Sequence, residues 1–149
     1  MDTMNGTVVL VQPPAWGRQS PPFASALLAA VLRREGFRVR CVDLNNDFYH
    51  HVPEQSKLRW KEEHYNFWNT PAFVNQLVEA ERAYLESVVR SICAEQPLFI
   101  GFSVVNTSRL FTEALSGLFR RAGTTAPLVL GGAMWTREHG PLIETLLRN

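Results

Sequence analysis

The sequence lacks the short glycine motifs by which α/β proteins most often hold phosphate groups. Neither the glycine fingerprint of dinucleotide-binding domains nor the P-loop pattern occurs in its 149 residues. The first apolar run, Val8–Val11, leads instead into QPPAWGRQSPPF, which has one glycine and four prolines, namely Pro13, Pro14, Pro21 and Pro22. Proline has no backbone N–H group, so this loop has few donors with which to clasp a diphosphate. The sequence therefore disfavours dinucleotide binding, and the loop also lacks the acidic residues that a receiver domain needs there.

Cysteine is scarce, charge is balanced and long apolar runs are absent. Cys41 and Cys93 are the only cysteines, and two distant thiols cannot by themselves hold an iron–sulfur cluster or a structural zinc. Lys and Arg total 15 and Asp and Glu total 14, without the dense basic stripe that nucleic-acid binding needs. There is no signal-peptide pattern and no uncharged run that could span a membrane. We therefore expect a soluble, cytoplasmic protein with reduced thiols that binds neither nucleic acid nor membrane.

What is present is an alternation of apolar segments with two different periods. Apolar residues make up 46% of the chain and charged residues 19%, as in a folded domain. Short apolar runs predict buried strands at 8–11, 98–105 and 127–132. The segment 37–44, FRVRCVDL, alternates apolar residues with arginines, which is typical of a half-exposed edge strand. Helical spacing of apolar residues predicts helices at 22–35, 70–96, 110–123 and 136–147.

This order of elements predicts the fold. Strands that alternate with helices form a parallel sheet joined by right-handed crossovers, with the most apolar strands in the middle. We predict an α/β, flavodoxin-like (Rossmann-like) doubly wound sheet with strand order 2-1-3-4, in one domain over residues 1–149. A complete fold of this type normally adds a fifth strand, so we expect the chain to be a fragment of a longer protein.

The strand order also predicts where a ligand would bind. The switch point lies between the first and third strands, and the loops expected to meet there are 13–20, 103–108 and 131–135. Prolines keep the first loop rigid, Gly131 and Gly132 have no side chains, and Ser103 and Asn106 supply hydroxyl and amide groups. These features predict a broad, flat, mostly uncharged shelf near the side chains of Trp16, Met134 and Trp135.

Three stretches of the chain resemble a known family. They are VVLVQPPAWGRQSPPFASALLAAVLRREGFRVRCVDLN, PLFIGFSVVNTSRLFTEALSGLFRR and PLVLGGAMW. The double proline after the first strand, the serine after the third and the glycine pair after the fourth are similar to the N-terminal cobalamin-binding domain of radical S-adenosylmethionine (SAM) enzymes. The resemblance covers nearly the whole chain apart from residues 45–69.

The resemblance implies a corrin ring across the carboxyl ends of the strands, with its nucleotide tail running down into the fold. By position, Ser103 would bond the tail, and Gly131 and Gly132 would let the tail pass close to the backbone. The residues that would border the ring are Pro14, Trp16, Gly17, Val105, Asn106 and Met134. At Val105 the family more often has leucine or methionine.

Two departures limit what this chain would do by itself. Many cobalamin domains carry Asp-x-His-x-x-Gly after the first strand, but no histidine lies in that loop here, so the implied cobalt has no histidine ligand. The three-cysteine motif of radical chemistry is also missing. S-adenosylmethionine and a 4Fe-4S cluster would therefore belong to a downstream radical SAM domain of the same chain, in a methyltransferase or a ring-forming enzyme. No catalytic residue is expected within these 149 residues.

Residues 45–69 have no clear period, so we expect an irregular insertion there. We predict that its aromatic residues pack it onto the sheet, with docking against another domain as the alternative; they are Phe48, Tyr49, Trp60, Tyr65, Phe67 and Trp68. His50, His51 and His64, near Glu62 and Glu63, match no familiar metal-site spacing. We therefore predict no metal ligand in this segment.

Two other functions are compatible with the sequence. One is the N-terminal, acceptor-side half of a two-domain glycosyltransferase, which also opens with an apolar strand, a proline-containing loop and a helix that ends before a glycine. The other is a degenerate module that keeps the fold, binds no cofactor and serves as a docking surface.

Overall fold

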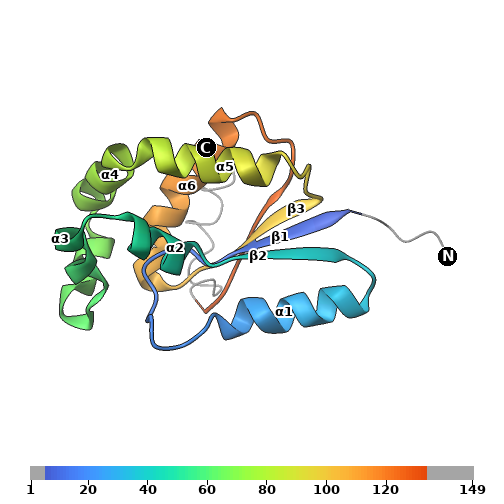
Figure 1. Cartoon of the computed structure of the whole chain (residues 1–149), viewed down its shortest axis with the longest axis horizontal. Helices are drawn as coiled ribbons and strands as arrows, with labels where there is room; N and C mark the ends of the chain where they lie inside the picture. Colours follow the sequence, from blue (N-terminus) through green and yellow to red (C-terminus); the bar gives the residue numbers. More distant parts are fainter. Residues whose placement is uncertain (1–5, 134–149) are drawn as a thin grey trace.

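A computed structural model describes residues 6–133, which contain a four-stranded parallel sheet (Figure 1). The strands are β1 (Thr7–Val11), β2 (Arg38–Val42), β3 (Phe99–Ser103) and β4 (Leu128–Gly131). Their order is β2-β1-β3-β4, and each pairing is parallel. The predicted α/β flavodoxin-like fold and its strand order are confirmed. β1 and β3 are the central strands because their unbroken apolar sequences suit burial on both faces.

Helices cover the two faces of the sheet unequally. Among the described helices, α1 (Phe23–Arg34) packs by itself on one face, and α5 (Arg82–Cys93) and α6 (Arg109–Arg121) lie on the other, with α4 (Pro71–Ala80) beside them (Figure 1). The reason is the handedness of the crossovers. The chain moves along the sheet in one direction from β1 to β2, and in the opposite direction from β2 to β3 and on to β4, so the connecting helices fall on opposite faces.

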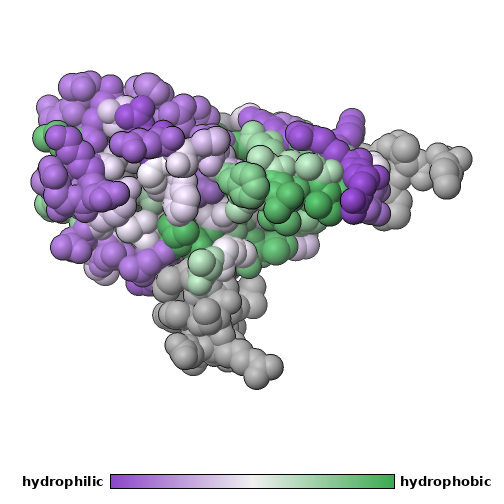
Figure 2. Space-filling model, turned by 90° about the horizontal axis from the view of Figure 1, so that it is seen from below, coloured by the Kyte–Doolittle hydropathy of each residue, from purple (hydrophilic) through white to green (hydrophobic). Residues whose placement is uncertain are grey.

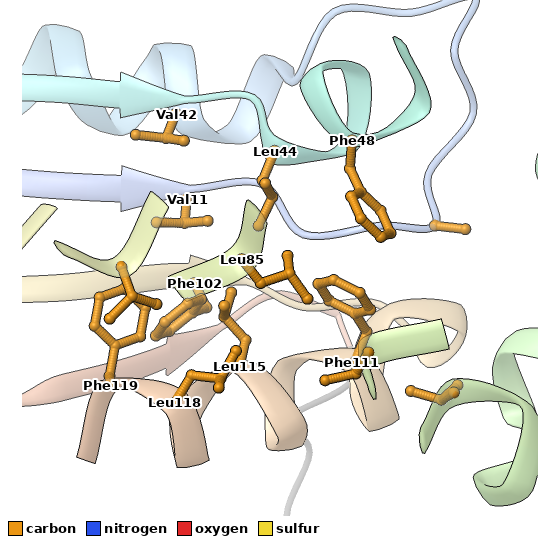
Figure 3. Packing of buried hydrophobic residues seen from close by; sticks show 14 of the residues in the cluster. Val11, Val42, Leu44, Phe48, Leu85, Phe102, Phe111, Leu115, Leu118 and Phe119 are labelled. Atoms are coloured by element: carbon orange, nitrogen blue, oxygen red, sulfur yellow. The ribbon is translucent and has the colours of Figure 1, made fainter. Parts of the chain in front are cut away.

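The larger hydrophobic core lies between the sheet and helices α5 and α6 (Figure 3). Val11, Val42 and Phe102 extend from the strands toward side chains of the helices. The helical side chains labelled in this core are Leu44, Phe48, Leu85, Phe111, Leu115, Leu118 and Phe119. Full burial of one such side chain stabilises the fold by about 1.5–3 kcal/mol, so this face supplies most of the apolar stabilisation.

Helix α1 rests on the sheet by a face of small residues. Ser25 and Ala29 are its buried residues. The apolar stripe predicted for this helix points largely outward instead: Phe23 is 75% exposed and Leu27 is 54% exposed, and Leu28 and Val31 are exposed as well. Figure 2 shows the resulting apolar surface on this side of the molecule. The spacing of the stripe was enough to predict the helix but not the direction that the stripe faces.

The fourth strand differs from its prediction. We expected 127–132 to be a buried strand, but β4 is the outermost strand on its side within the described residues. Its side chains alternate between half-buried and exposed, and Val129 is 46% exposed. An apolar sequence is common to central strands and to edge strands that another element covers, so composition could not separate the two. β2, by contrast, is an edge strand as its arginines predicted.

The helix predicted over 70–96 is two helices in the structure. It begins as expected, with Thr70 at the N-cap position and Pro71 at the first helical position. It is interrupted at Glu81, whose φ of −105° and ψ of 18° separate α4 from α5. No glycine or proline stands at this point, so the sequence carries no signal for the break.

The segment 45–69, predicted to be irregular, is helical. It contains α2 (Leu44–His51), the one-turn α3 (Glu54–Lys57), and two 3₁₀ helices, η1 (Leu58–Trp60) and η2 (Glu62–Asn69). Asp43 caps α2 by accepting a hydrogen bond from the Asn46 backbone N–H at 3.0 Å. Each helix is too short to display a helical period, which is why the pattern was missed.

The predicted last helix at 136–147, together with Met134 and Trp135, lies outside the described residues. Within residues 6–133, no helix combines the length and the apolar character needed to cross a bilayer.

Candidate functional site

A cavity of about 1050 Å³ opens at the carboxyl ends of β1 and β3. Its volume is at the upper end of the range for small-molecule sites, about 300–1,000 Å³. One wall comes from the loop after β1 (15–20), with 105–107 after β3 beside it. The other wall comes from the insertion and consists of Tyr49, Glu54, Lys57, Leu58, Trp60, Lys61, Glu62, Glu63 and Tyr65. Two of the three loops predicted to meet at the switch point are thus brought together here.

The loop after β1 is held to both neighbouring strands. Gln12 is only 4% exposed; its backbone N–H donates to the Val42 carbonyl at 2.9 Å, and its side-chain Nε2 donates to the Ser103 carbonyl at 3.4 Å. Further along, the Thr107 hydroxyl donates to the Ala15 carbonyl at 2.6 Å. These bonds satisfy the backbone carbonyls of Val42, Ser103 and Ala15, and they fix the loop against the ends of β2 and β3.

The insertion forms its wall around a buried aromatic cluster. Phe48, Trp60 and Trp68 are buried, and the Trp60 and Trp68 rings meet edge to face at a centroid distance of 4.8 Å. The Trp68 indole N–H donates to the Arg59 carbonyl at 2.8 Å, so the polar atom of that ring is satisfied. The aromatic residues therefore pack the insertion onto the α/β core, as the packing interpretation expected.

The cavity is more charged than the predicted uncharged shelf, and that prediction is wrong. The insertion brings acidic and basic side chains to the rim, where Lys57 pairs with Glu54 at 2.7 Å. From the opposite wall, the Arg18 guanidinium lies over the Tyr49 ring at 3.3 Å from its centroid. The error has a simple cause: the prediction considered only the loops at the strand ends, whereas tertiary packing adds the insertion.

Tyr65 gives the cavity a hydroxyl that stays protonated at neutral pH. Burial raises the pKa of Tyr65 above its ordinary value of 10.0, and the negative charge of Glu62 raises it further. A neutral phenol can both donate and accept a hydrogen bond. Beside it, Glu62 and Glu63 can accept hydrogen bonds and Lys61 can donate them, so the rim can both donate to and accept from a polar ligand.

The structure brings some of the site residues predicted from sequence into the cavity and places others outside it. Trp16, Gly17, Val105 and Asn106 line the cavity. Pro14 is buried just before it. Ser103 ends β3 and pairs in register with Gly131 of β4, and neither residue is in the cavity lining. Met134 lies outside the described residues. What sequence reasoning missed is the insertion, because no local motif marks Tyr49, Trp60 or Tyr65 as part of a site.

Gly132 has a structural reason to be glycine. Its φ is +114°, and a Cβ atom built there would lie 2.3 Å from the Val104 carbonyl oxygen. The neighbouring Val104 N–H donates to the Gly131 carbonyl at 2.7 Å. Gly132 thus allows the β3 and β4 backbones to come close together, whereas a Cβ at Gly131 would find only the Phe102 carbonyl, at 3.9 Å.

The histidines of the insertion contact aromatic rings and carboxylates. His51 stacks on Tyr84 with a centroid distance of 3.8 Å and lies 3.0 Å from the Glu81 carboxylate. His64 lies 3.8 Å from the Glu63 carboxylate. Within the part of the chain that the structure describes, no three His, Cys, Asp or Glu side chains come together as a metal site.

Comparison with known proteins does not assign this chain to a family. No family model matches it. No curated protein matches it, and no solved structure does. The fold and the cavity therefore carry the functional argument by themselves.

Proposed function

We propose that this chain is a cobalamin-binding module, which holds the corrin ring at the carboxyl ends of β1 and β3. In the proposed role it presents the cofactor to a radical SAM domain of the same protein, in the cytoplasm, and does not itself catalyse. The observation that carries the proposal is the cavity of about 1050 Å³ beside a loop rich in proline. A wide ring with an uncharged amide periphery fits such a cavity. A diphosphate is usually held by backbone N–H groups at a helix start, and here α1 begins directly after Pro21 and Pro22, which have no N–H group.

The residues around the cavity support the fit. Gly17 has no atom within 4 Å of the position that a Cβ would take, so the space beside it is open to a ligand. Trp16 and Val105 offer apolar surface to a ring, and Asn106 offers an amide. On the opposite wall, Tyr65 and Lys61 can donate hydrogen bonds to the carboxamide oxygens.

The face of the sheet on which α1 packs supports the position proposed for the nucleotide tail. Arg33 donates from Nη2 to the Val39 carbonyl at 3.0 Å, so that flank of α1 lies over β2. Leu28 and Val31, on the other flank by helical geometry, face the side where β3 and β4 lie. Ser103 and Gly131, a register pair of small residues, lie at the carboxyl ends of these two strands.

We propose that the Ser103 hydroxyl binds the nucleotide tail. Its carbonyl accepts from Gln12, but within residues 6–133 its hydroxyl makes no hydrogen bond. A half-buried hydroxyl without a partner next to open apolar surface suits a polar atom of the tail.

When bound, cobalamin would supply a cobalt centre able to accept and release a methyl group. The loop from Gln12 to Ser20 contains no histidine, so this chain's part of the site offers cobalt no imidazole ligand from that loop. The role left to the residues is to bind and orient the corrin: Trp16 and Val105 against the ring, and Asn106 and Tyr65 at its periphery.

Hydroxocobalamin tests the proposal directly. The protein is mixed with the cofactor and desalted, and we expect corrin absorbance in the protein fraction at a stoichiometry near one. Gly17→Phe should abolish retention without lowering the free energy of unfolding, because the new ring enters open space. Ala72→Phe, an exposed position on α4, is the matched control and should bind normally.

The other outcomes separate the alternatives. Retention of a nucleotide sugar without corrin would support the glycosyltransferase half. Retention of neither ligand, in this chain and in a longer natural form of it, would contradict cobalamin binding and favour a docking module.

A further inference from the structure

Asn45 joins the two walls of the cavity. Its side-chain Oδ1 accepts from the Trp16 backbone N–H at 3.0 Å and from the Trp60 indole Nε1 at 2.8 Å. Its Nδ2 donates to the Trp16 carbonyl at 3.1 Å. Trp16 belongs to the loop after β1, and Trp60 belongs to the insertion. One amide therefore satisfies both backbone polar groups of Trp16 and the polar atom of Trp60.

The position of Asn45 makes this junction rigid. The residue is only 3% exposed, so its hydrogen bonds are shielded from water. Its backbone N–H donates to the Gln12 carbonyl at 2.9 Å, and it lies in the first turn of α2, whose start Asp43 caps. The end of β1 and the start of the insertion are thus tied to the same residue.

We propose that Asn45 is a positioning residue of the ligand cavity. It holds Trp16 and Gly17 at a fixed distance from the wall formed by the insertion. A wide, rigid ligand fits only when the two walls are separated by the correct distance. Walls that already have this separation raise the affinity, because binding then costs no conformational entropy for ordering the loop. The insertion is then part of the ligand site. The effect on cobalamin rests on the function proposed above; the coupling of the two walls does not.

No other side chain of the described residues makes the same connection from the interior. Arg18 stacked on Tyr49 also bridges the loop and the insertion, but both lie at the rim of the cavity, and Arg18 is exposed. An exposed cation–π contact is weaker than a buried set of hydrogen bonds. Variants of Asn45 therefore test the coupling more cleanly than variants of Arg18.

The informative change is Asn45→Asp, which removes a single donor. A carboxylate can still accept from the Trp16 N–H and the Trp60 indole, but it faces the Trp16 carbonyl without a hydrogen. When the new carboxyl group is protonated at lower pH, its O–H can donate to that carbonyl again. Asn46→Asp, on the exposed neighbouring residue, is the matched control.

Amide hydrogen exchange without any ligand gives the first measurement. After correction for intrinsic rates, Asn45→Asp should speed exchange of residues 15–20 about fivefold or more at neutral pH, as expected for one lost hydrogen bond. Lowering the pH should reverse this, whereas Asn46→Asp should show neither effect. Asn45→Ala, which removes both bonds to Trp16, should speed the same amides about 25-fold.

Hydroxocobalamin affinity gives the second measurement. In Asn45→Asp the affinity for hydroxocobalamin should fall at neutral pH, where exchange of the loop is faster, and should recover at lower pH. A loss of overall stability would not produce this recovery. Unchanged exchange at 15–20 in Asn45→Asp would overturn the inference whether or not the protein binds cobalamin. Faster exchange with wild-type affinity would refute the positioning role. If the wild-type protein retains no corrin but exchange changes as expected, the coupling of the walls stands and cobalamin binding is refuted.

Discussion

The glycine pair at the end of β4 offers a way to separate structural from ligand-binding glycines. The resemblance assigns Gly131 and Gly132 one role, close approach of a cofactor tail. Of these two glycines, Gly132 has the positive φ, and a Cβ atom there would clash with the Val104 backbone at 2.3 Å, whereas at Gly131 the nearest atom lies at 3.9 Å. We therefore expect Gly132→Ala to destabilise the fold and Gly131→Ala to leave its stability unchanged.

The magnitude follows from the contacts. An L-residue in a left-handed conformation costs about 1–2 kcal/mol. The alanine Cβ would also lie 2.3 Å from the Val104 carbonyl oxygen, so the two backbones must separate. This separation breaks the 2.7 Å bond from the Val104 N–H to the Gly131 carbonyl, which is worth about 1 kcal/mol. Together these effects predict a loss of about 2–3 kcal/mol for Gly132→Ala.

Urea unfolding followed by tryptophan fluorescence measures both variants. We expect Gly132→Ala to unfold at clearly lower urea with an unchanged slope, and its melting temperature to fall by about 5–10 °C. Gly131→Ala, with its nearest contact at 3.9 Å, should stay within about 0.5 kcal/mol of wild type. If Gly131 borders the tail as proposed, the same variant should weaken hydroxocobalamin retention.

One result would refute the reasoning about Gly132. If Gly132→Ala were as stable as wild type, the β3 and β4 backbones would not approach each other as described. Equal destabilisation by both alanine variants would show instead that the strand end as a whole tolerates no side chain.

Further predictions test the core and the ionisable groups. Phe111→Ala, at a fully buried position, should lose about 3–5 kcal/mol, whereas Phe23→Ala, at a ring that is 75% exposed, should change stability by less than about 0.5 kcal/mol; both are read from urea unfolding. Burial, and then a nearby carboxylate (Glu62 and Asp47 respectively), raises the pKa of Tyr65 and of Tyr84 above 10.0. Because the folded state binds these protons more tightly, their contribution to stability is complete below pH 10 and is lost as pH rises through the folded pKa. The stability of the wild type should therefore fall more steeply above about pH 10 than that of the Tyr65→Phe/Tyr84→Phe variant, and equal slopes would contradict the raised pKa values.

The sequence was informative where a segment's own pattern determines its structure. The apolar run at Val8–Val11 and the arginine-striped segment 37–44 predicted a central and an edge strand, and both are found. Four of the predicted site residues share one cavity because their loops follow adjacent parallel strands. The prediction failed for the uncharged shelf, since Lys57, Lys61 and Glu62 come from a segment whose helices are too short to show a period.

The order of strands followed from the sequence by itself, because alternating strands and helices have one favoured handedness and the arginines select the edge. Long-range packing was needed for the rest: which flank of α1 stays exposed, that β4 is an edge among the described residues, and that Asn45 reaches Trp16, 29 residues away. The physical reason is that a local pattern reports only periodicity and polarity. A cavity wall and a buried hydrogen-bond partner depend on segments that meet only when the chain has folded.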